Sequence, residues 1–261
     1  MSLVIDAHTH FPPDPAYPER LLKEYDRLGI DKVCVSGLGA QFNMATNDDV
    51  ERAFKSHPDR IIGFGYFRLG RDNLRLIDRF VESGFKGVKF TCPMHNYDDY
   101  RYDPIYARIE EVGLPALFHS CIIWRNPNDK EFNVSSDRVR PVLLDRVART
   151  FPKMQMILAH LGMPWHSEAA EMPRFHPNLV VDLTGSMGGW RAHTPPEKFK
   201  EWFWWPRALE TIVFGTDVFL EEVETVYKRD RELCRLLGLD KAVEDKIFGG
   251  TMARILKLVG F

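Results

Sequence analysis

Five side chains of the sequence have the types and the spacing expected of a catalytic metal site. His8 and His10 are separated by one residue, and His119, His160 and Asp217 each stand at or just beyond the end of a short apolar run. Residues two apart in a strand point to the same side, so His8 and His10 would chelate one ion together. Imidazole and carboxylate ligands suit zinc, and also manganese, iron or cobalt. The pattern predicts a catalytic divalent metal site, with zinc expected, and the lack of cysteine in the set argues against a structural zinc site.

The elements that would carry these side chains repeat along the chain. Short apolar segments begin about every 30 residues, the size of one βα unit, and segments with helical periodicity lie between them. The eight predicted strands are 4–8, 32–36, 61–65, 86–90, 115–119, 155–160, 178–182 and 211–215. The predicted helices include 19–28, 48–56, 73–83, 104–112, 137–151 and 196–209, with closing helices at 240–247 and 252–258.

Strands that are apolar along most of their length indicate a parallel sheet covered on both faces. The chain of 261 residues matches the roughly 250 residues of one (β/α)8 TIM barrel, so we predict a single α/β domain over residues 1–261. An open doubly wound sheet is the alternative, but no glycine-rich phosphate loop follows the first predicted strand. A barrel would bring the five side chains to the carboxyl ends of its strands, where enzymes of this fold have their active sites.

The composition favours a small-molecule substrate. Lys and Arg number 35 against 37 Asp and Glu, and the net charge of −2 offers no positive excess for binding a nucleic acid. No apolar run approaches the roughly 20 residues needed to cross a bilayer, so no membrane association is expected. The four cysteines are widely spaced and no signal-like segment opens the chain, which favours a cytoplasmic protein with reduced thiols. Whether the protein forms a homodimer is left open.

Four ordered motifs carry a resemblance to a known family. They are Ile5-Asp6-Ala7-His8-Thr9-His10, Leu117-Phe118-His119-Ser120, Ile157-Leu158-Ala159-His160-Leu161-Gly162 and Phe214-Gly215-Thr216-Asp217. These strings resemble the amidohydrolase superfamily, and within it the amidohydrolase-2 branch, which includes aminocarboxymuconate-semialdehyde decarboxylase and related lyases and lactonases. The segment 249–254 resembles the closing signature of the family, except that Thr251 stands where the family usually has Asn.

The resemblance implies a role for each of the five side chains. One ion would be ligated by His8, His10, His119 and Asp217, while His160 would approach the water or the substrate without being a full ligand. Asp217 would share its carboxylate between the ion and a proton of the water. His160 would act as an acid/base or as an electrostatic stabiliser of charge on a substrate oxygen.

Lys89 ends the fourth predicted strand, where two-metal members of the superfamily carry a carboxylated lysine that bridges both ions. The amidohydrolase-2 branch mostly works with one ion. Lys89 is therefore a candidate for second-metal or substrate binding, and otherwise its ammonium would pair with a nearby carboxylate or bind an anionic substrate.

Candidate substrate contacts follow the same strand ends, and they are Phe11, His95, Trp124, Arg125, Trp165, Trp190, Arg191 and Phe219. Arg125 or Arg191 would be suited to hold a carboxylate through two parallel hydrogen bonds. The aromatic run 202–205 is expected on an outer helix, in the core or at a subunit interface. Cys121 could face the site, but no neighbouring residue in the sequence builds a Cys-His nucleophile pair with it.

The favoured function is a metal-dependent hydrolase, in which an activated water attacks a lactone, amide or ester. A metal-dependent decarboxylase of a small aromatic or dienoic acid is the alternative, and an arginine clamp beside the metal would favour it. A TatD-type deoxyribonuclease fits less well, because that group has a glutamate where this chain has Lys89, and because the chain has no basic excess. A purely structural metal site would instead require four protein ligands closed around the ion.

Overall fold

Eight parallel strands lie in chain order in one sheet of the computed structural model, which describes residues 3–258. The strands are β1 (Ile5–His10), β2 (Lys32–Ser36), β3 (Ile61–Phe67), β4 (Gly87–Phe90), β5 (Ala116–Phe118), β6 (Met156–Leu158), β7 (Leu179–Asp182) and β8 (Ile212–Val213). Two hydrogen bonds join the last strand to the first: Ala7 N donates to Phe214 O at 2.9 Å, and Asp217 N donates to His8 O at 2.8 Å. The predicted (β/α)8 barrel is therefore confirmed.

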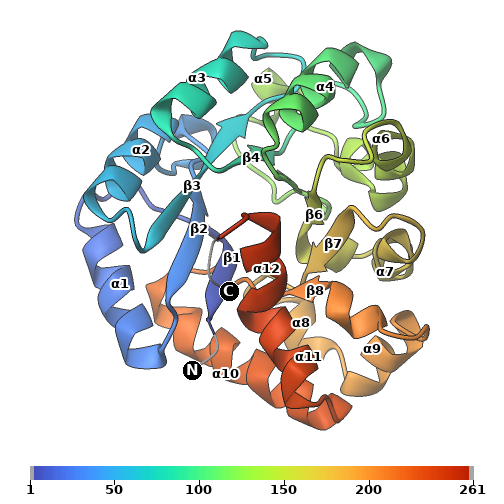
Figure 1. Cartoon of the computed structure of the whole chain (residues 1–261). Helices are drawn as coiled ribbons and strands as arrows, with labels where there is room; N and C mark the ends of the chain where they lie inside the picture. The colour runs from blue at the N-terminus through green and yellow to red at the C-terminus, as the bar shows by residue number, and fades with distance from the viewer. Residues whose placement is uncertain (1–2, 259–261) are drawn as a thin grey trace.

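Helices surround the sheet, and α12 lies across its centre (Figure 1). They are α1 (Tyr17–Leu28), α2 (Asn47–Ser56), α3 (Arg75–Ser83), α4 (Asp103–Val112), α5 (Asp129–Phe132), α6 (Leu144–Thr150), α7 (His166–Phe175), α8 (Trp190–His193), α9 (Pro196–Trp202), α10 (Leu220–Leu237), α11 (Lys241–Asp245) and α12 (Thr251–Ile255). Short 3-10 segments lie at Ala40–Phe42, Tyr100–Tyr102, Ser136–Val139, Pro141–Leu143, Ala159–Gly162 and Ala208–Thr211, and a π-helical turn spans Lys246–Gly250. Within residues 3–258, no helix combines the length and the apolarity needed to cross a bilayer.

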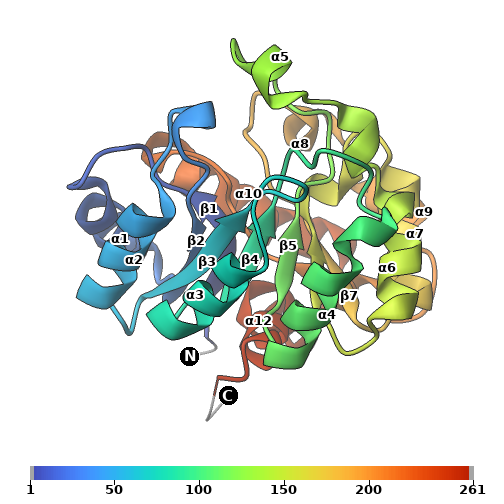
Figure 2. The ribbon, with the colours of Figure 1, turned by 90° about the horizontal axis from the view of Figure 1, so that it is seen from above.

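The C-terminal helix closes one end of the barrel. Met252, Ala253 and Ile255 of α12 pack against the inward-facing residues of the strands, among them Phe64 and Ile157. Figure 2 shows α12 at one end of the strands and the loop that carries α5 at the other. Helix α12 thus covers the end of the barrel opposite the carboxyl ends of the strands, where the predicted site residues lie.

A bulge in β1 turns both of its histidines toward the barrel interior. The register between β1 and β2 shifts between Asp6 and Thr9, where β1 holds one extra residue. A bulge of this kind interrupts the alternation of side chains between the two faces of a sheet. Ala7 packs in the barrel interior, and His8, the next residue, also faces inward, as does His10. The bulge thus separates an apolar half of β1 from a half that carries the site.

Asp6 fastens β1 to the last strand on the outer side of the barrel. Its buried carboxylate accepts hydrogen bonds from Tyr25 Oη of α1 at 2.5 Å, from Thr216 Oγ1 at 2.6 Å and from Thr216 N at 3.0 Å. Burial raises the pKa of Asp6 to about 6, and these hydrogen bonds oppose that rise. The contacts hold Thr216, and with it the neighbouring Asp217, against β1.

Some predicted boundaries differ from the structure. Strands β5 and β6 end at Phe118 and Leu158, so His119 and His160 lie just beyond them rather than inside them. The predicted helix 137–151 is divided, because Pro141 has no N–H and cannot continue a helix through its own position. The predicted helix 196–209 ends at Trp202, so the rest of the aromatic run leaves the helix. The proline at 206 would also have interrupted a helix of the predicted length, because it disfavours helical backbone at residue 205.

The closure at α12 predicts that Gly249→Ala destabilises the protein. A Cβ on Gly249 would collide with the carbonyl oxygen of Leu3, so backbone must shift, and we expect a loss of about 1–3 kcal/mol in the free energy of unfolding measured with urea. Gly188→Ala is the matched control, because the nearest atom to its new Cβ, Ser186 Oγ, is 3.5 Å away. Equal stability of the two variants would contradict the tight packing at Gly249.

Candidate metal centre

His8 and His10 present one ring nitrogen each to a shared point. His8 Nδ1 lies 2.9 Å from Asp182 Oδ2, and His10 Nδ1 lies 2.8 Å from the carbonyl oxygen of Ser36. Because these oxygens accept hydrogen bonds, each Nδ1 carries the proton and each Nε2 keeps its lone pair. The two Nε2 atoms are 3.2 Å apart, and Asp217 Oδ1 lies 3.9 Å from the first and 3.5 Å from the second.

These three atoms fit the requirements of a divalent ion. Ligand atoms about 2.1 Å from a tetrahedrally coordinated ion lie about 3.4 Å from one another. The separations among His8 Nε2, His10 Nε2 and Asp217 Oδ1 span this value, and both imidazoles are held from behind by an acceptor, as metal-binding histidines usually are. The donor set therefore suits a catalytic ion with oxygen and nitrogen ligands.

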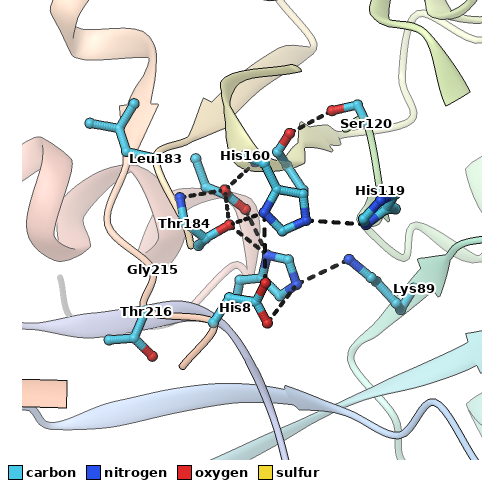
Figure 3. A network of polar contacts seen from close by, with 12 residues as sticks. His8, Lys89, His119, Ser120, His160, Leu183, Thr184, Gly215 and Thr216 are labelled. Carbon is cyan, nitrogen blue, oxygen red and sulfur yellow. Dashed lines mark hydrogen bonds and ion pairs between the residues drawn. The ribbon is translucent and has the colours of Figure 1, made fainter. Parts of the chain in front are cut away.

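His119 and His160 join the same cluster through each other. His119 Nδ1 lies 3.1 Å from His160 Nε2 (Figure 3). His160 Nδ1 lies 3.6 Å from Asp217 Oδ2. On its other side, His119 Nε2 lies 3.3 Å from the thiol of Cys121. The structure thus brings all five predicted residues together, but His119 reaches the group of His8, His10 and Asp217 by way of His160.

Asp182 and Thr184 support the cluster, and the sequence did not single them out. Asp182 Oδ1 accepts hydrogen bonds from His160 N at 2.8 Å, Thr184 N at 3.0 Å and Thr184 Oγ1 at 2.5 Å, while its other oxygen holds His8. Asp182 and Thr184 are fully buried. A signal for Asp182 was present, because it ends a predicted strand just as His119 and His160 do.

The backbone at the site adopts an uncommon conformation. His160, Leu161 and Asp217 have φ values of 61°, 43° and 47°, in the left-handed region that non-glycine residues rarely occupy. Each such residue costs on the order of 1–3 kcal/mol and persists only when surrounding contacts enforce it. Here the contacts are the bond from His160 N to Asp182 and the bond from Asp217 N to the carbonyl of His8.

The histidines are held in their neutral form. Burial lowers the pKa of His10 and of His119 to about 3, and it also lowers the pKa values of His8 and His160. Neutral imidazole is the form that binds a metal ion, so in this environment protons compete weakly for the ring nitrogens.

The family of the chain follows from its match to a family model over residues 5–258, described as "Amidohydrolase". The chain belongs to the amidohydrolase family. Members of this family are metal-dependent enzymes that act on small molecules. A search of curated proteins finds no match.

Solved structures resemble this amidohydrolase along almost its whole length. A 2,6-dihydroxybenzoate decarboxylase with bound 2,6-dihydroxybenzoate has a TM-score of 0.70 at 17% identity and covers 100% of both chains. A probable 2-pyrone-4,6-dicarboxylic acid hydrolase from Acinetobacter baumannii, with citric acid bound, has a TM-score of 0.68 at 12% identity, covering 98% of this chain and 99% of the other. A 5-carboxyvanillate decarboxylase from Novosphingobium aromaticivorans, holding manganese, has a TM-score of 0.63 at 15% identity, with 98% and 97% covered. At these identities the likeness shows the fold alone.

Lys89 places a positive charge inside the amidohydrolase site. It is almost fully buried, and its Nζ lies 3.0 Å from His8 Nε2, the lone pair that would bind the ion. Burial lowers the pKa of the Lys89 ammonium and raises the pKa of the Asp217 carboxyl, and the attraction between the two charges opposes both shifts. Because an ion would take the lone pair of His8 Nε2, ion binding would require the Lys89 ammonium to leave His8. The ammonium could then donate to another acceptor.

A recess of about 260 Å³ opens beside the cluster. Its lining residues are His10, Met44, Ser186, Asp217, Val218, Phe219 and Glu222. Of the predicted substrate contacts, Phe219 lines this recess. Trp124 is 88% exposed, Arg125 is also exposed, and Trp165 is half-buried with the Arg140 guanidinium over its ring. These three do not line the recess.

The other predicted contacts lie elsewhere in the amidohydrolase. Phe11 is buried against the ring of Tyr17, and His95 is exposed. Trp190 donates its Nε1 hydrogen to the carbonyl of Thr184 at 3.3 Å, and its ring packs on His166. Trp190 is thus held by the loop that follows β7.

Arg191 is buried and its guanidinium is engaged within the fold. Nε donates to Leu183 O at 2.8 Å, and Nη2 donates to Gly215 O at 3.1 Å and pairs with Asp230 Oδ2 at 3.2 Å. These bonds tie together the segments that follow β7 and β8. This geometry does not favour the expectation that Arg191 clamps a substrate carboxylate. It indicates instead that Arg191 positions the two segments, at the ends of β7 and β8, that carry Asp182 and Asp217.

Asp182→Asn should weaken the binding of a divalent ion by about 10- to 100-fold, because an amide cannot accept all the hydrogen bonds that the carboxylate accepts. Competition with a chromophoric chelator measures this affinity. Asp145→Asn is the control, because Asp145 pairs with His176 and Arg149 away from the cluster. Unchanged affinity in a folded Asp182→Asn variant would show that the carboxylate does not orient the ligands.

Arg191→Met should lower the free energy of unfolding by about 3–5 kcal/mol, because it leaves the buried carboxylate of Asp230 without its partner. The double variant Arg191→Met/Asp230→Leu removes that charge as well and should regain part of the stability. Urea unfolding of the three proteins tests this. A stable Arg191→Met variant that binds carboxylate ligands poorly would instead assign the guanidinium to the substrate.

Proposed function

We propose that this amidohydrolase hydrolyses a small-molecule lactone, amide or ester with one divalent ion, for which zinc is the expected metal. The observation that carries the proposal is the convergence of two lone-pair Nε2 atoms and a carboxylate oxygen beside a recess. The Asp217 side chain remains 21% exposed, so water and substrate can reach this point. An ion bound there would lower the pKa of a water from 15.7 to about 7 and would polarise a carbonyl.

Asp217 and His160 would share the proton transfers. Asp217 Oδ1 faces the two Nε2 atoms, whereas Oδ2 faces His160 at 3.6 Å and is free to take a proton from the attacking water. The Thr184 hydroxyl donates to Asp182, so its oxygen accepts from His160 Nδ1 at 2.8 Å, which leaves Nε2 of His160 as a proton acceptor. A protonated His160 would steady charge on the substrate oxygen and return the proton to the leaving group.

Decarboxylation is the second candidate, and two observations support it. Two of the structural neighbours named above are decarboxylases, and the buried Lys89 ammonium could hold a carboxylate beside the centre. Against it, Arg191 is engaged within the fold and Arg125 lies on an exposed loop, so no arginine clamp lines the recess among the described residues. Hydrolysis is therefore the preferred reaction.

The proposal predicts a tightly bound divalent ion and turnover that is lost on chelation and restored by zinc. Asp217→Asn should lower kcat/KM by about 10²- to 10⁴-fold, because both proton transfer and ion binding lose a carboxylate oxygen. A panel of lactones, esters and amides in ¹⁸O-labelled water measures hydrolysis through label incorporation. Asp14→Asn, a change to an exposed carboxylate that pairs with Arg20, is the control.

Two results would contradict this function. Protein that holds no divalent ion would exclude the mechanism, as would an Asp217→Asn variant with full metal-dependent turnover. Release of carbon dioxide without incorporation of label would replace hydrolysis by decarboxylation at the same site.

A further inference from the structure

The recess beside the metal-ligand cluster has a distinct chemical character. Met44, Val218 and Phe219 provide an apolar wall, and Ser186 and Glu222 provide the polar groups beyond His10 and Asp217. Two carboxylates and no lysine or arginine line it. Its volume of about 260 Å³ lies just below the roughly 300–1,000 Å³ of pockets for drug-sized ligands, so it suits a small group.

Glu222 is fixed in place with one oxygen left to bind a ligand. It lies in the first turn of α10, and its Oε2 accepts a hydrogen bond from Met187 N at 3.0 Å, which ties it to the loop after β7. Among residues 3–258, Oε1 has no hydrogen-bond or ion-pair partner. An acidic residue in a first turn also offsets the helix dipole, but the neighbouring Glu221 serves that purpose from an exposed position outside the recess.

We propose that Glu222 makes this recess a subsite for a cationic amino group of the substrate, joined by a short apolar linker to the carbonyl that is hydrolysed. This inference rests on the proposed function. The ammonium would donate to the free Oε1 of Glu222, and the ring of Phe219 in the same wall offers a second favourable contact for a cation. A carboxylate in this position would be repelled by Glu222, so acidic substrates are disfavoured here.

The geometry divides the substrate between two electrostatic environments. Lys89 and a bound ion attract the electron-rich carbonyl at the centre, whereas Glu222 attracts positive charge at the edge of the recess. A substrate with an amino group on one side of its reacting carbonyl satisfies both. This arrangement separates the chain from enzymes that take a dicarboxylic acid.

Binding of metal-chelating probes tests the subsite without requiring turnover. Three hydroxamic acids share the same three-methylene chain and end in an ammonium, a methyl or a carboxylate group. Calorimetric titration of the zinc-loaded protein should find the ammonium probe bound about 10-fold more tightly than the methyl probe, the size expected for a hydrogen bond to a charged group, and the carboxylate probe bound most weakly. High salt should reduce the preference, because Glu222 is not fully buried.

Glu222→Gln should bring the ammonium and methyl probes within about 2-fold of each other while leaving the affinity of the methyl probe unchanged, because the amide keeps the shape and removes the charge. Glu221→Gln, the matched control on the same turn, should keep the full preference. Equal binding of the three probes to the unmodified protein, or a preference for the carboxylate, would overturn the subsite. Failure of the protein to load zinc, or of every probe to bind, would overturn the proposed function as well.

Discussion

A carboxylate that has lost all contact with water organises the open end of this barrel. Asp182 compensates for its burial by accepting hydrogen bonds from His8, from the backbone of His160 and from Thr184. An ionised carboxylate in a dry interior is costly unless such donors surround it, so the donors cannot move independently. Three strand ends are thereby fixed relative to one another, and the ring of His8 has one allowed orientation.

Asp6 performs the complementary task on the outer side of β1. Its bonds to Tyr25 and Thr216 hold the last strand against the first at the place where the barrel closes. Each carboxylate holds one of the left-handed segments: Asp182 accepts from the backbone of His160, and Asp6 accepts from the backbone of Thr216, the residue before Asp217. Side chains presented from strained, fully bonded backbone lose little further freedom when a ligand binds, which is the usual advantage of a rigid site.

The sequence was sufficient for the barrel and for the membership of the cluster, because both depend on local patterns. The repeat of strand and helix, and the placement of five side chains at strand ends, are visible along the chain. The supporting contacts are not visible in this way. His8 and Asp182 are 174 residues apart, and Arg191 finds Asp230 only because α10 packs against the loop after β7. Whether an arginine near a strand end binds substrate or stabilises the fold depends on such distant partners. The same is true of whether Glu222 keeps one oxygen free.

The bulge in β1 also determines which changes in that strand the protein can tolerate. A substitution at Thr9 alters one side chain, but the loss of Thr9 would make the two histidines neighbours in the part of β1 that follows the bulge. Adjacent residues of a regular strand face opposite sides of the sheet, so one of the two histidines would then face away from the barrel interior. The chelating pair is therefore a property of the length of this segment as much as of its composition, and loss of a single codon there would abolish the pair while leaving both histidines in the sequence.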